Sequence, residues 1–342
     1  MSLSEIRIFV LTVLIAAAGA VVARLLALPA PYLIGPATAV TIAGFAGLTL
    51  RIPQHVRNAT FIVVGLSMGA GLTPEVFVAA RTWPLSFLMV PVAVVILLYS
   101  ATWTLQRFFG YDRATALLAA SPGHLSFVLS LASDTRSDLL AVGVIQSVRV
   151  LALTITVPLI VEVLGLVSVA PPPAAVMHPL ALAGSFAAAA ALGYLLIRLK
   201  VPAALLLGGM IASGSTHLTG IVSGDLPSWI MTPTYVLLGA VIGSRFSGAS
   251  YRAMRTAFIA GGVVTVVVVV LAAAIAVLVS YLTAVPLDAA LIAFAPGGLE
   301  TMAAMAVMLH AQPTYVGAHH VLRLVILSVL MPFVLRRDIT RR

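Results

Sequence analysis

Two short stretches decide how this chain folds. They read Ala-Ser-Pro-Gly-His at residues 120–124 and Phe-Ala-Pro-Gly-Gly at residues 294–298. Each lies in the middle of an apolar run, where proline removes a backbone donor and glycine weakens the helical preference. We therefore expect each run to form two short half-helices. About nine or ten residues of helix cover about 15 Å, roughly half of the hydrocarbon core of a bilayer.

The two stretches occupy equivalent places in a duplicated sequence. Pro122 and Pro296 are 174 residues apart, and the same shift aligns many other residues of the chain with each other. Aligned pairs include Gly65 with Gly239, Gly69 with Gly243, and Arg149 with Arg323. We expect two repeats, residues 1–170 and 171–342, within one integrated membrane domain. Duplicated halves with broken apolar segments at matching places are typical of transporters that bind substrate at the repeat interface.

The composition requires a bilayer as solvent. Hydrophobic residues make up 61% of the chain and charged residues 8%, with a mean hydropathy of +1.15. The absence of cysteine excludes disulfides, thiolate metal sites and iron–sulfur clusters. The first apolar run, from Ile6 to Ala27, is too long for a signal-peptide core, so we expect a retained span. The net charge of +9 comes from basic residues at segment ends, which set topology rather than bind nucleic acid.

Each repeat contains six apolar runs. They cover 5–27, 31–50, 55–72, 84–109, 113–133 and 139–165, then 176–198, 201–222, 228–246, 257–284, 288–310 and 313–335. The third run of each repeat is short and is followed by an amphipathic piece, Thr73 to Arg81 or Ser247 to Arg255, that we expect at the membrane interface.

Each broken run could cross the membrane or turn back as a re-entrant hairpin, and loop charge decides between the two. With both hairpins re-entrant and the N-terminus cytoplasmic, fifteen of the 19 Lys and Arg lie inside, two outside and two within spans. With both runs crossing, nine lie inside and eight outside. Cytoplasmic loops favour Lys and Arg. We therefore predict an all-α polytopic protein of the bacterial inner membrane, built from two inverted repeats of five spans plus one hairpin each. Both termini are then cytoplasmic.

In this arrangement the hairpin tips meet near the middle of the membrane. Arg149 and Arg323 lie about ten residues into their spans, at a similar depth. An arginine at that depth by default marks a functional pathway. We expect Arg149 and Arg323 to bind substrate charge; the alternative is that each fastens a helix to a hairpin.

Glu300 lies in the first turn of the second half-helix, where the first repeat has Ser126. It can serve as a simple helix cap, since the helix dipole stabilises a carboxylate there. It can also bind the coupling ion, H⁺ or Na⁺. If Glu300 neutralises Arg323, Arg149 remains unpaired, and the free N–H groups at the tips add further attraction for anions. This favours an anionic substrate that carries a carboxylate.

The other substrate-binding candidates lie near the tips. They are Ser121, Gly123, His124, Ser126, Gln146, Gly297, Gly298, Thr301 and His320, with Ser147 nearby. Serine and threonine in membrane helices also make plain interhelical contacts, and His319 and His320 could instead sit at the outer interface. The Pro-to-Gly patterns at 28–36 and 201–209 favour tightly packed scaffold, and Asp112, Asp134 and Asp138 are expected in solvent.

The motif order resembles known families. Met68-Gly69-Ala70-Gly71-Leu72, an amphipathic stretch, a full span and Ser121-Pro122-Gly123-His124 follow each other as in the cation/proton antiporter and anion transporter superfamily. The doubled pattern resembles the membrane AbrB-duplication family, whose members are labelled AbrB-family regulator or ammonia monooxygenase. The resemblance implies an inverted-repeat transporter with a mobile core of the last three elements of each repeat, and a homodimer. The second repeat departs from the first motif, reading Ile242-Gly243-Ser244-Arg245-Phe246.

We expect secondary active transport of a small organic anion, coupled to H⁺ or Na⁺, without a cofactor, metal or enzymatic activity. A monooxygenase needs a metal centre, yet no two of the seven histidines show helical i, i+4 spacing. A copper or iron site from His124, His319, His320 and Glu300 is the remaining metal alternative. A membrane regulator of gene expression is the other alternative, although no loop exceeds about twenty residues, which is too short for a DNA-reading domain.

Overall fold

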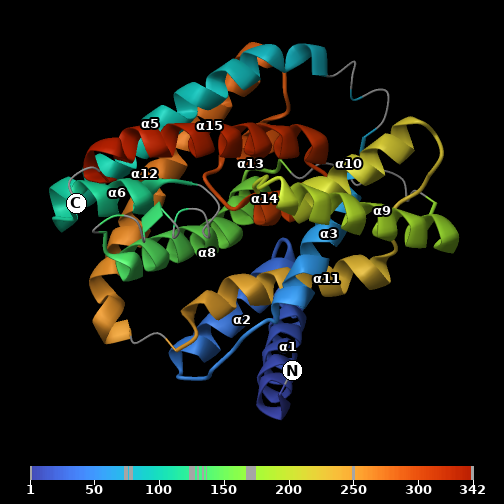
Figure 1. The fold of residues 1–342 in the computed structure, drawn as a ribbon, viewed down its shortest axis with the longest axis horizontal. Helices are drawn as coiled ribbons and strands as arrows, with labels where there is room; N and C mark the ends of the chain where they lie inside the picture. Colours follow the sequence, from blue (N-terminus) through green and yellow to red (C-terminus); the bar gives the residue numbers. More distant parts are fainter. Residues whose placement is uncertain are drawn as a thin grey trace.

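The computed structural model describes residues 2–72, 76, 80–122, 128, 131–132, 135, 137–166, 175–248 and 251–339. Within these residues the chain is helical, and the only β-structure is an isolated bridge between Val176 and Asp225 (Figure 1). The first repeat contains α1 (Leu3–Leu25), α2 (Pro31–Phe45), α3 (Gln54–Ala70), η1 (Ala80–Thr82), α5 (Pro84–Phe109), α6 (Arg113–Ala120) and α8 (Leu139–Val163). The second contains α9 (Pro179–Arg198), α10 (Ala204–Leu218), α11 (Ser228–Gly243), η2 (Ser244–Phe246), α12 (Tyr251–Thr283), α13 (Leu287–Phe294), α14 (Leu299–Met308) and α15 (Pro313–Ile339).

Six of the described helices are long and apolar enough to cross a membrane: α1, α5, α8, α9, α12 and α15. The prediction of an all-helical membrane protein is confirmed to this extent. The helix α12 begins at Tyr251 and so includes part of the piece Ser247 to Arg255, while its apolar span begins at Arg255. Most of the corresponding piece in the first repeat, Thr73 to Arg81, lies outside the described residues.

At both predicted breaks a short helix ends at or just before the proline. In the first repeat α6 ends at Ala120, and Ser121 is extended with φ −60° and ψ 120°. In the second repeat α13 ends at Phe294, and α14 starts at Leu299 after an extended Gly298. Each break exposes the last carbonyls of a short helix, which need partners inside a membrane.

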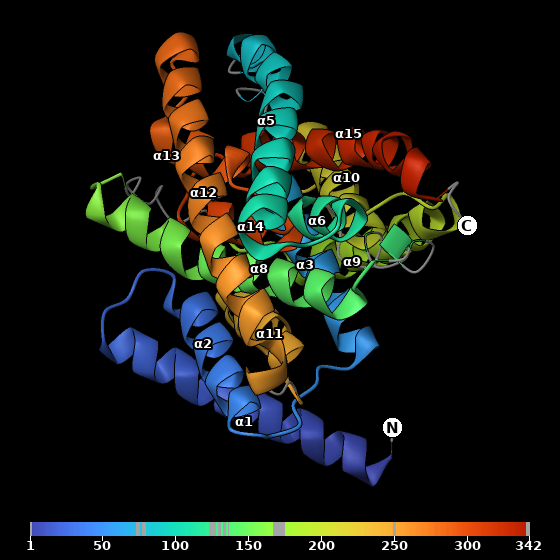
Figure 2. The same cartoon turned by 90° about the vertical axis from the view of Figure 1, so that its left-hand side faces the viewer.

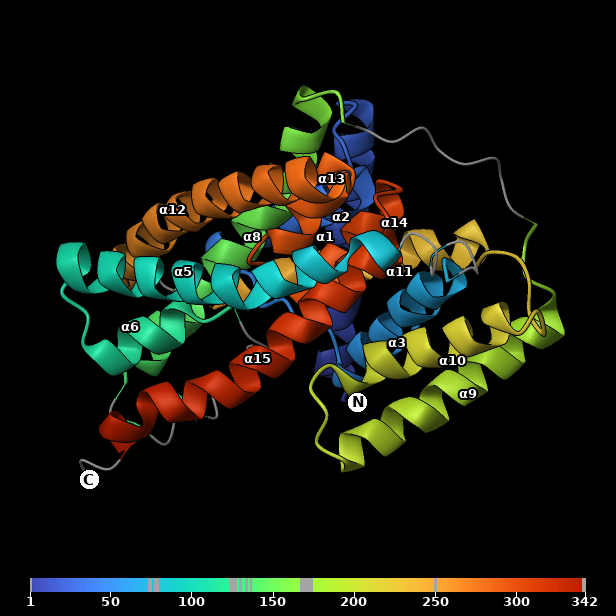
Figure 3. The same ribbon diagram turned by 90° about the horizontal axis from the view of Figure 1, so that it is seen from above.

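The helices form two groups. We call α1, α2, α3, α9, α10, α11 and η2 the scaffold bundle: α3 packs on α10, α2 on α11, α1 on α2, α9 on α10, and η2 on α2. We call α5, α6, α8, α12, α13, α14 and α15 the core bundle, in which α12 contacts both α5 and α8. Figure 3 shows α9 and α10 beside α3, with α5, α6 and α12 on the other side of the molecule. In Figure 2, α1 and α2 lie together, away from α5.

Glycines allow the scaffold helices to approach closely. A Cβ on Gly65 would collide with the Leu206 carbonyl oxygen of α10, and a Cβ on Gly239 would lie 2.6 Å from the carbonyl oxygen of Leu33 in α2. Gly35 likewise faces Gly19 of α1, and Gly208 faces Gly193 of α9. The tight packing expected for 28–36 and 201–209 is confirmed. Small residues at helix contacts are a common basis of helix association in membranes.

Replacement of Gly65 by alanine is therefore expected to destabilise the scaffold by about 1–3 kcal/mol, because overpacking forces backbone to move. The matched control is Gly262→Ala in α12, where the added methyl meets no atom within 4 Å. That change should be neutral or slightly stabilising, since alanine favours helix over glycine. Thermal unfolding of the purified, detergent-solubilised variants measures both. Equal melting temperatures for the two variants would contradict the close packing of α3 on α10.

Candidate functional site

The first break is held by Arg149 of α8. Its Nη1 donates to the carbonyl oxygens of Ala120 (2.9 Å) and Ala119 (3.3 Å), and its Nη2 donates to that of Ser121 (3.0 Å). Arg149 is buried, and its Nε has no partner among the described residues. It thus caps the C-terminal end of α6, where the helix dipole favours a cation. These contacts favour the alternative in which the arginine fastens helix to hairpin.

The second break is held in the same way by Arg323 of α15. Its Nη1 and Nη2 donate to the carbonyl oxygens of Ala295 and Gly297, each at 2.6 Å. The terminal nitrogens of Arg323 therefore bond the backbone carbonyls at this break. Arg149 and Arg323 nevertheless lie close enough to repel each other electrostatically. Two buried like charges near both breaks raise the local potential for an anion.

Gln146 and His320, both predicted to bind substrate, make a second equivalent pair of contacts. The Gln146 amide nitrogen donates to the Leu118 carbonyl oxygen (2.8 Å), and His320 Nε2 donates to that of Ile292 (2.9 Å). Both side chains are buried. Like the arginine contacts, these bonds join α8 to α6 and α15 to α13. Gln146 also lines the cavity described below.

The other predicted residues separate into three groups. Ser121 is buried and its hydroxyl has no partner within the described part of the chain, while Thr301 is buried in α14. Gly123, His124 and Ser126, like Asp134, lie outside the described residues. Ser147 donates to the Gly143 carbonyl oxygen of its own helix (2.7 Å), which is a structural contact.

His319 and His320 are not exposed at an interface, the alternative left open by the sequence. His319 Nε2 lies 2.7 Å from Ser86 Oγ, which lies 2.5 Å from the Tyr315 hydroxyl, and its ring stacks on Phe87. This buried network joins α5 to α15. Across the described residues, no three His, Asp or Glu side chains gather in a metal-binding group.

A cavity of about 270 Å³ lies where the scaffold bundle meets the core bundle. The scaffold contributes Arg57 of α3, Arg245 of η2, and Arg51 from the segment before α3. The core contributes Arg149, Glu300 and both breaks, through Pro122, Gly297 and Gly298. Both chain breaks, where the sequence predicts a binding site, therefore border a cavity that both bundles line.

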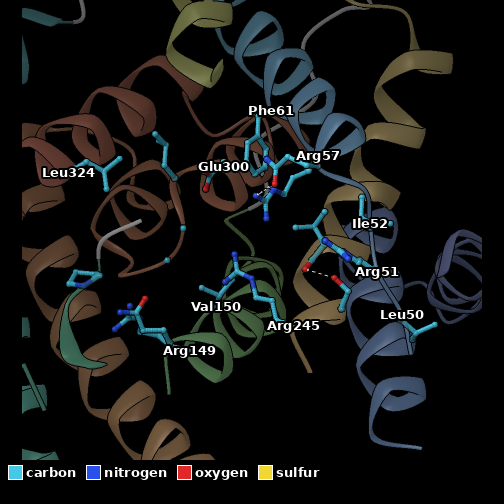
Figure 4. Close-up of a pocket in the computed structure, with 18 residues that line it drawn as sticks. Leu50, Arg51, Ile52, Arg57, Phe61, Arg149, Val150, Arg245, Glu300 and Leu324 are labelled. Atoms are coloured by element: carbon cyan, nitrogen blue, oxygen red, sulfur yellow. Dashed lines mark hydrogen bonds between the residues drawn. The ribbon is translucent and has the colours of Figure 1, made fainter. Parts of the chain in front are cut away.

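The cavity is strongly electropositive, because four arginines line it with a single glutamate. Arg57, Arg245 and Glu300 gather around one space, with Arg149 set apart (Figure 4). Glu300 attracts the guanidinium of Arg245, whereas Arg57 repels it. Arg57 Nη2 donates to Gln54, and its Nε is buried without a partner in the described residues. Arg245 is exposed, so it can meet a ligand that enters the cavity.

Sequence reasoning missed Arg51, Arg57 and Arg245, which it counted only as loop charges. The duplicated sequence distinguishes these three arginines from Arg149 and Arg323, because their aligned positions carry other residue types. At a shift of 174 residues, Arg57 aligns with Met231, Arg245 with Gly71, and Arg51 with Asp225. Arg149 and Arg323, which are aligned, bond the carbonyls at the breaks, whereas Arg51, Arg57 and Arg245 have no arginine at the aligned position.

The chain matches known proteins over most of its length. The family described as transition state regulatory protein AbrB matches residues 32–337. An "Uncharacterized protein YhjN" of Bacillus subtilis (strain 168) is 27% identical over 289 residues, covering 79% of this chain and 75% of that protein. A "Putative regulator AbrB" of Escherichia coli (strain K12) is 27% identical over 319 residues, covering 90% of both chains. No solved structure matches. This helical membrane protein belongs to the AbrB family.

Proposed function

We propose that this protein is a secondary transporter that carries a small organic anion across the bacterial inner membrane by alternating access. The observation that carries the proposal is the arginine-lined cavity at the junction of the two bundles. Arginine guanidinium groups bind carboxylates through paired, charge-assisted hydrogen bonds. Because ligand pockets commonly measure about 300–1,000 Å³, a cavity of about 270 Å³ favours a small substrate.

Matched packing supports an inverted-repeat arrangement. The contact of α3 with α10 has its counterpart in α11 with α2, that of α5 with α6 in α12 with α13, and that of α6 with α8 in α13 with α15. Transporters built this way bind substrate near mid-membrane and work by moving one bundle against the other. The division of the cavity between scaffold and core supports such a movement.

The two ends of the first hairpin lie side by side. Asp112 caps the start of α6 through Thr115 N (3.0 Å), and Asp138 caps the start of α8 through Ala141 N (3.0 Å). The Asp138 amide also donates to Thr115 Oγ1 (2.9 Å), which joins the two helix starts. The expectation that Asp112 and Asp138 are exposed is met, and both also act as helix caps. A chain that returns to its starting level supports a re-entrant hairpin.

Cysteine labelling tests this topology, and the chain has no native cysteine to interfere. We expect a membrane-impermeant maleimide to label His310→Cys on intact cells. It should label Ser137→Cys and Lys200→Cys only after permeabilisation, because both lie on the cytoplasmic side of the inverted arrangement. His310→Cys is the control, since residue 310 is outside whether the hairpins turn back or cross. Labelling of residues 137 and 200 on intact cells would mean that the broken segment crosses.

Transport itself is tested with proteoliposomes. The purified protein should take up at least one member of a labelled series of acetate, succinate and citrate, above protein-free vesicles. The family description and the E. coli relative carry regulator names, and transport of a metabolite would give an indirect route to gene expression. If expression effects persist in a variant that has lost all uptake, a regulator without transport is the better assignment.

A further inference from the structure

We propose that the coupling ion is a proton, and that the transported anion competes with the Glu300 carboxylate for Arg57 and Arg245. This inference rests on the proposed function and names the coupling at the same site. It follows from the placement of an acid among the cations that would bind the substrate.

Glu300 and its partners come from opposite sides of the cavity. Glu300 belongs to α14 of the core and is half-buried, while Arg57 and Arg245 belong to the scaffold. Glu300 attracts Arg245 across the space that a substrate would occupy (Figure 4). The Glu300 carboxylate thus places a negative charge next to Arg245, where we expect the negative charge of the anion.

The other charged groups around Glu300 are already engaged or remote. The helices α3, α8, α13 and α15 pack against α14. Their titratable groups nearest the cavity, besides Arg57, are Arg149, Arg323 and His320, which bond the hairpin carbonyls, while Asp288 lies at the far end of α13. Arg51 lies at the cavity wall before α3. The cavity arginines that bond no carbonyl at a break are thus Arg51, Arg57 and Arg245, and Glu300 attracts Arg245.

Binding an anion next to ionised Glu300 brings two negative charges into one small cavity. Repulsion between them is removed when the Glu300 carboxylate takes up one proton from the bulk solution, so one proton is bound for each anion. When the anion leaves, the carboxyl group releases that proton and pairs with Arg245 again. A sodium ion would have to bind beside two guanidinium groups that repel it, whereas a proton on the carboxylate only cancels a charge.

Calorimetry counts the proton directly. Whichever of acetate, succinate or citrate the wild type accepts is titrated into the full-length protein in two buffers that differ in ionisation enthalpy. We expect uptake of about one proton per anion. In the pH range where Glu300 is ionised, the affinity for the anion should fall about tenfold for each unit by which the pH rises. Glu300→Gln mimics the protonated acid, so it should bind the anion without proton uptake and independently of pH. Glu300→Asp should keep the uptake.

The matched control is Glu162→Gln, the same chemical change at an exposed position near the end of α8. It should behave as the wild type. If the wild type binds a carboxylate without proton uptake, or if Glu300→Gln takes up protons as the wild type does, proton coupling through Glu300 is wrong while the transport function stands. If no carboxylate binds or is taken up by the wild type, the proposed function fails, and the coupling with it.

Discussion

Replacement of Arg245 by glutamine is expected to lower anion uptake by at least about 100-fold without lowering the melting temperature. Arg245 lines the cavity, is exposed to it, and is the cation that Glu300 attracts. A hydrogen bond to a charged group contributes about 1.5–3 kcal/mol, and a carboxylate can accept two from one guanidinium, so the about 2.7 kcal/mol that corresponds to the 100-fold effect is expected. Because its side chain faces open space, folding should not depend on it.

Arg198→Gln is the control for this prediction. Arg198 is an exposed arginine at the end of α9, so the variant loses the same charge away from the cavity. Its uptake should equal that of the wild type. Uptake by Arg245→Gln within twofold of the control would remove Arg245 from the binding site.

Replacement of Arg149 by alanine is expected to destabilise the protein as well as stop transport, whereas Arg245→Gln should leave the stability unchanged. Three hydrogen bonds to the carbonyl oxygens of Ala119, Ala120 and Ser121 are lost. Buried carbonyls without partners cost about 1–3 kcal/mol each, so a loss of several kcal/mol is expected even if water partly replaces the guanidinium group. Thermal unfolding of the purified variant measures the loss.

Two further variants test the capping role. Arg323→Ala should destabilise similarly, because Arg323 holds the Ala295 and Gly297 carbonyls of the second break. Arg149→Lys should recover only part of the stability, because a compact ammonium group lacks the forked donors with which the guanidinium bonds three carbonyl oxygens. A melting temperature of Arg149→Ala equal to that of the wild type would contradict the capping role. Substrate binding would then be the role that remains for Arg149.

The amino-acid sequence allowed much of the architecture to be predicted. Pro122 and Pro296 located both breaks, because proline and glycine interrupt a helix whatever surrounds them. The repeat also predicted the glycine contacts of α2 and α10, since a backbone approach as close as that of Gly35 to Gly19 tolerates no side chain. The helix α12 begins at Tyr251, ahead of its apolar run, because a helix can continue with polar residues beyond the membrane.

The site was harder to predict than the fold. Arg149, Arg323 and Glu300 were found because they interrupt apolar runs, but their hydrogen bonds depend on tertiary packing that no spacing reveals. Arg57 and Arg245 lie at the ends of apolar runs, where an arginine ordinarily meets bulk solvent. Only the packing of α3 against α14, and of η2 against α2 and α8, brings those ends to a cavity.

The central claim is that an anion binds between the two bundles at Arg57 and Arg245. The most direct test is a cryo-electron microscopy map of the full-length protein with the carboxylate that it transports. We predict density for the anion in the cavity, within hydrogen-bond distance of Arg57 and Arg245 and beside Glu300. Density for the carboxylate at another place, with this cavity empty, would contradict the claim.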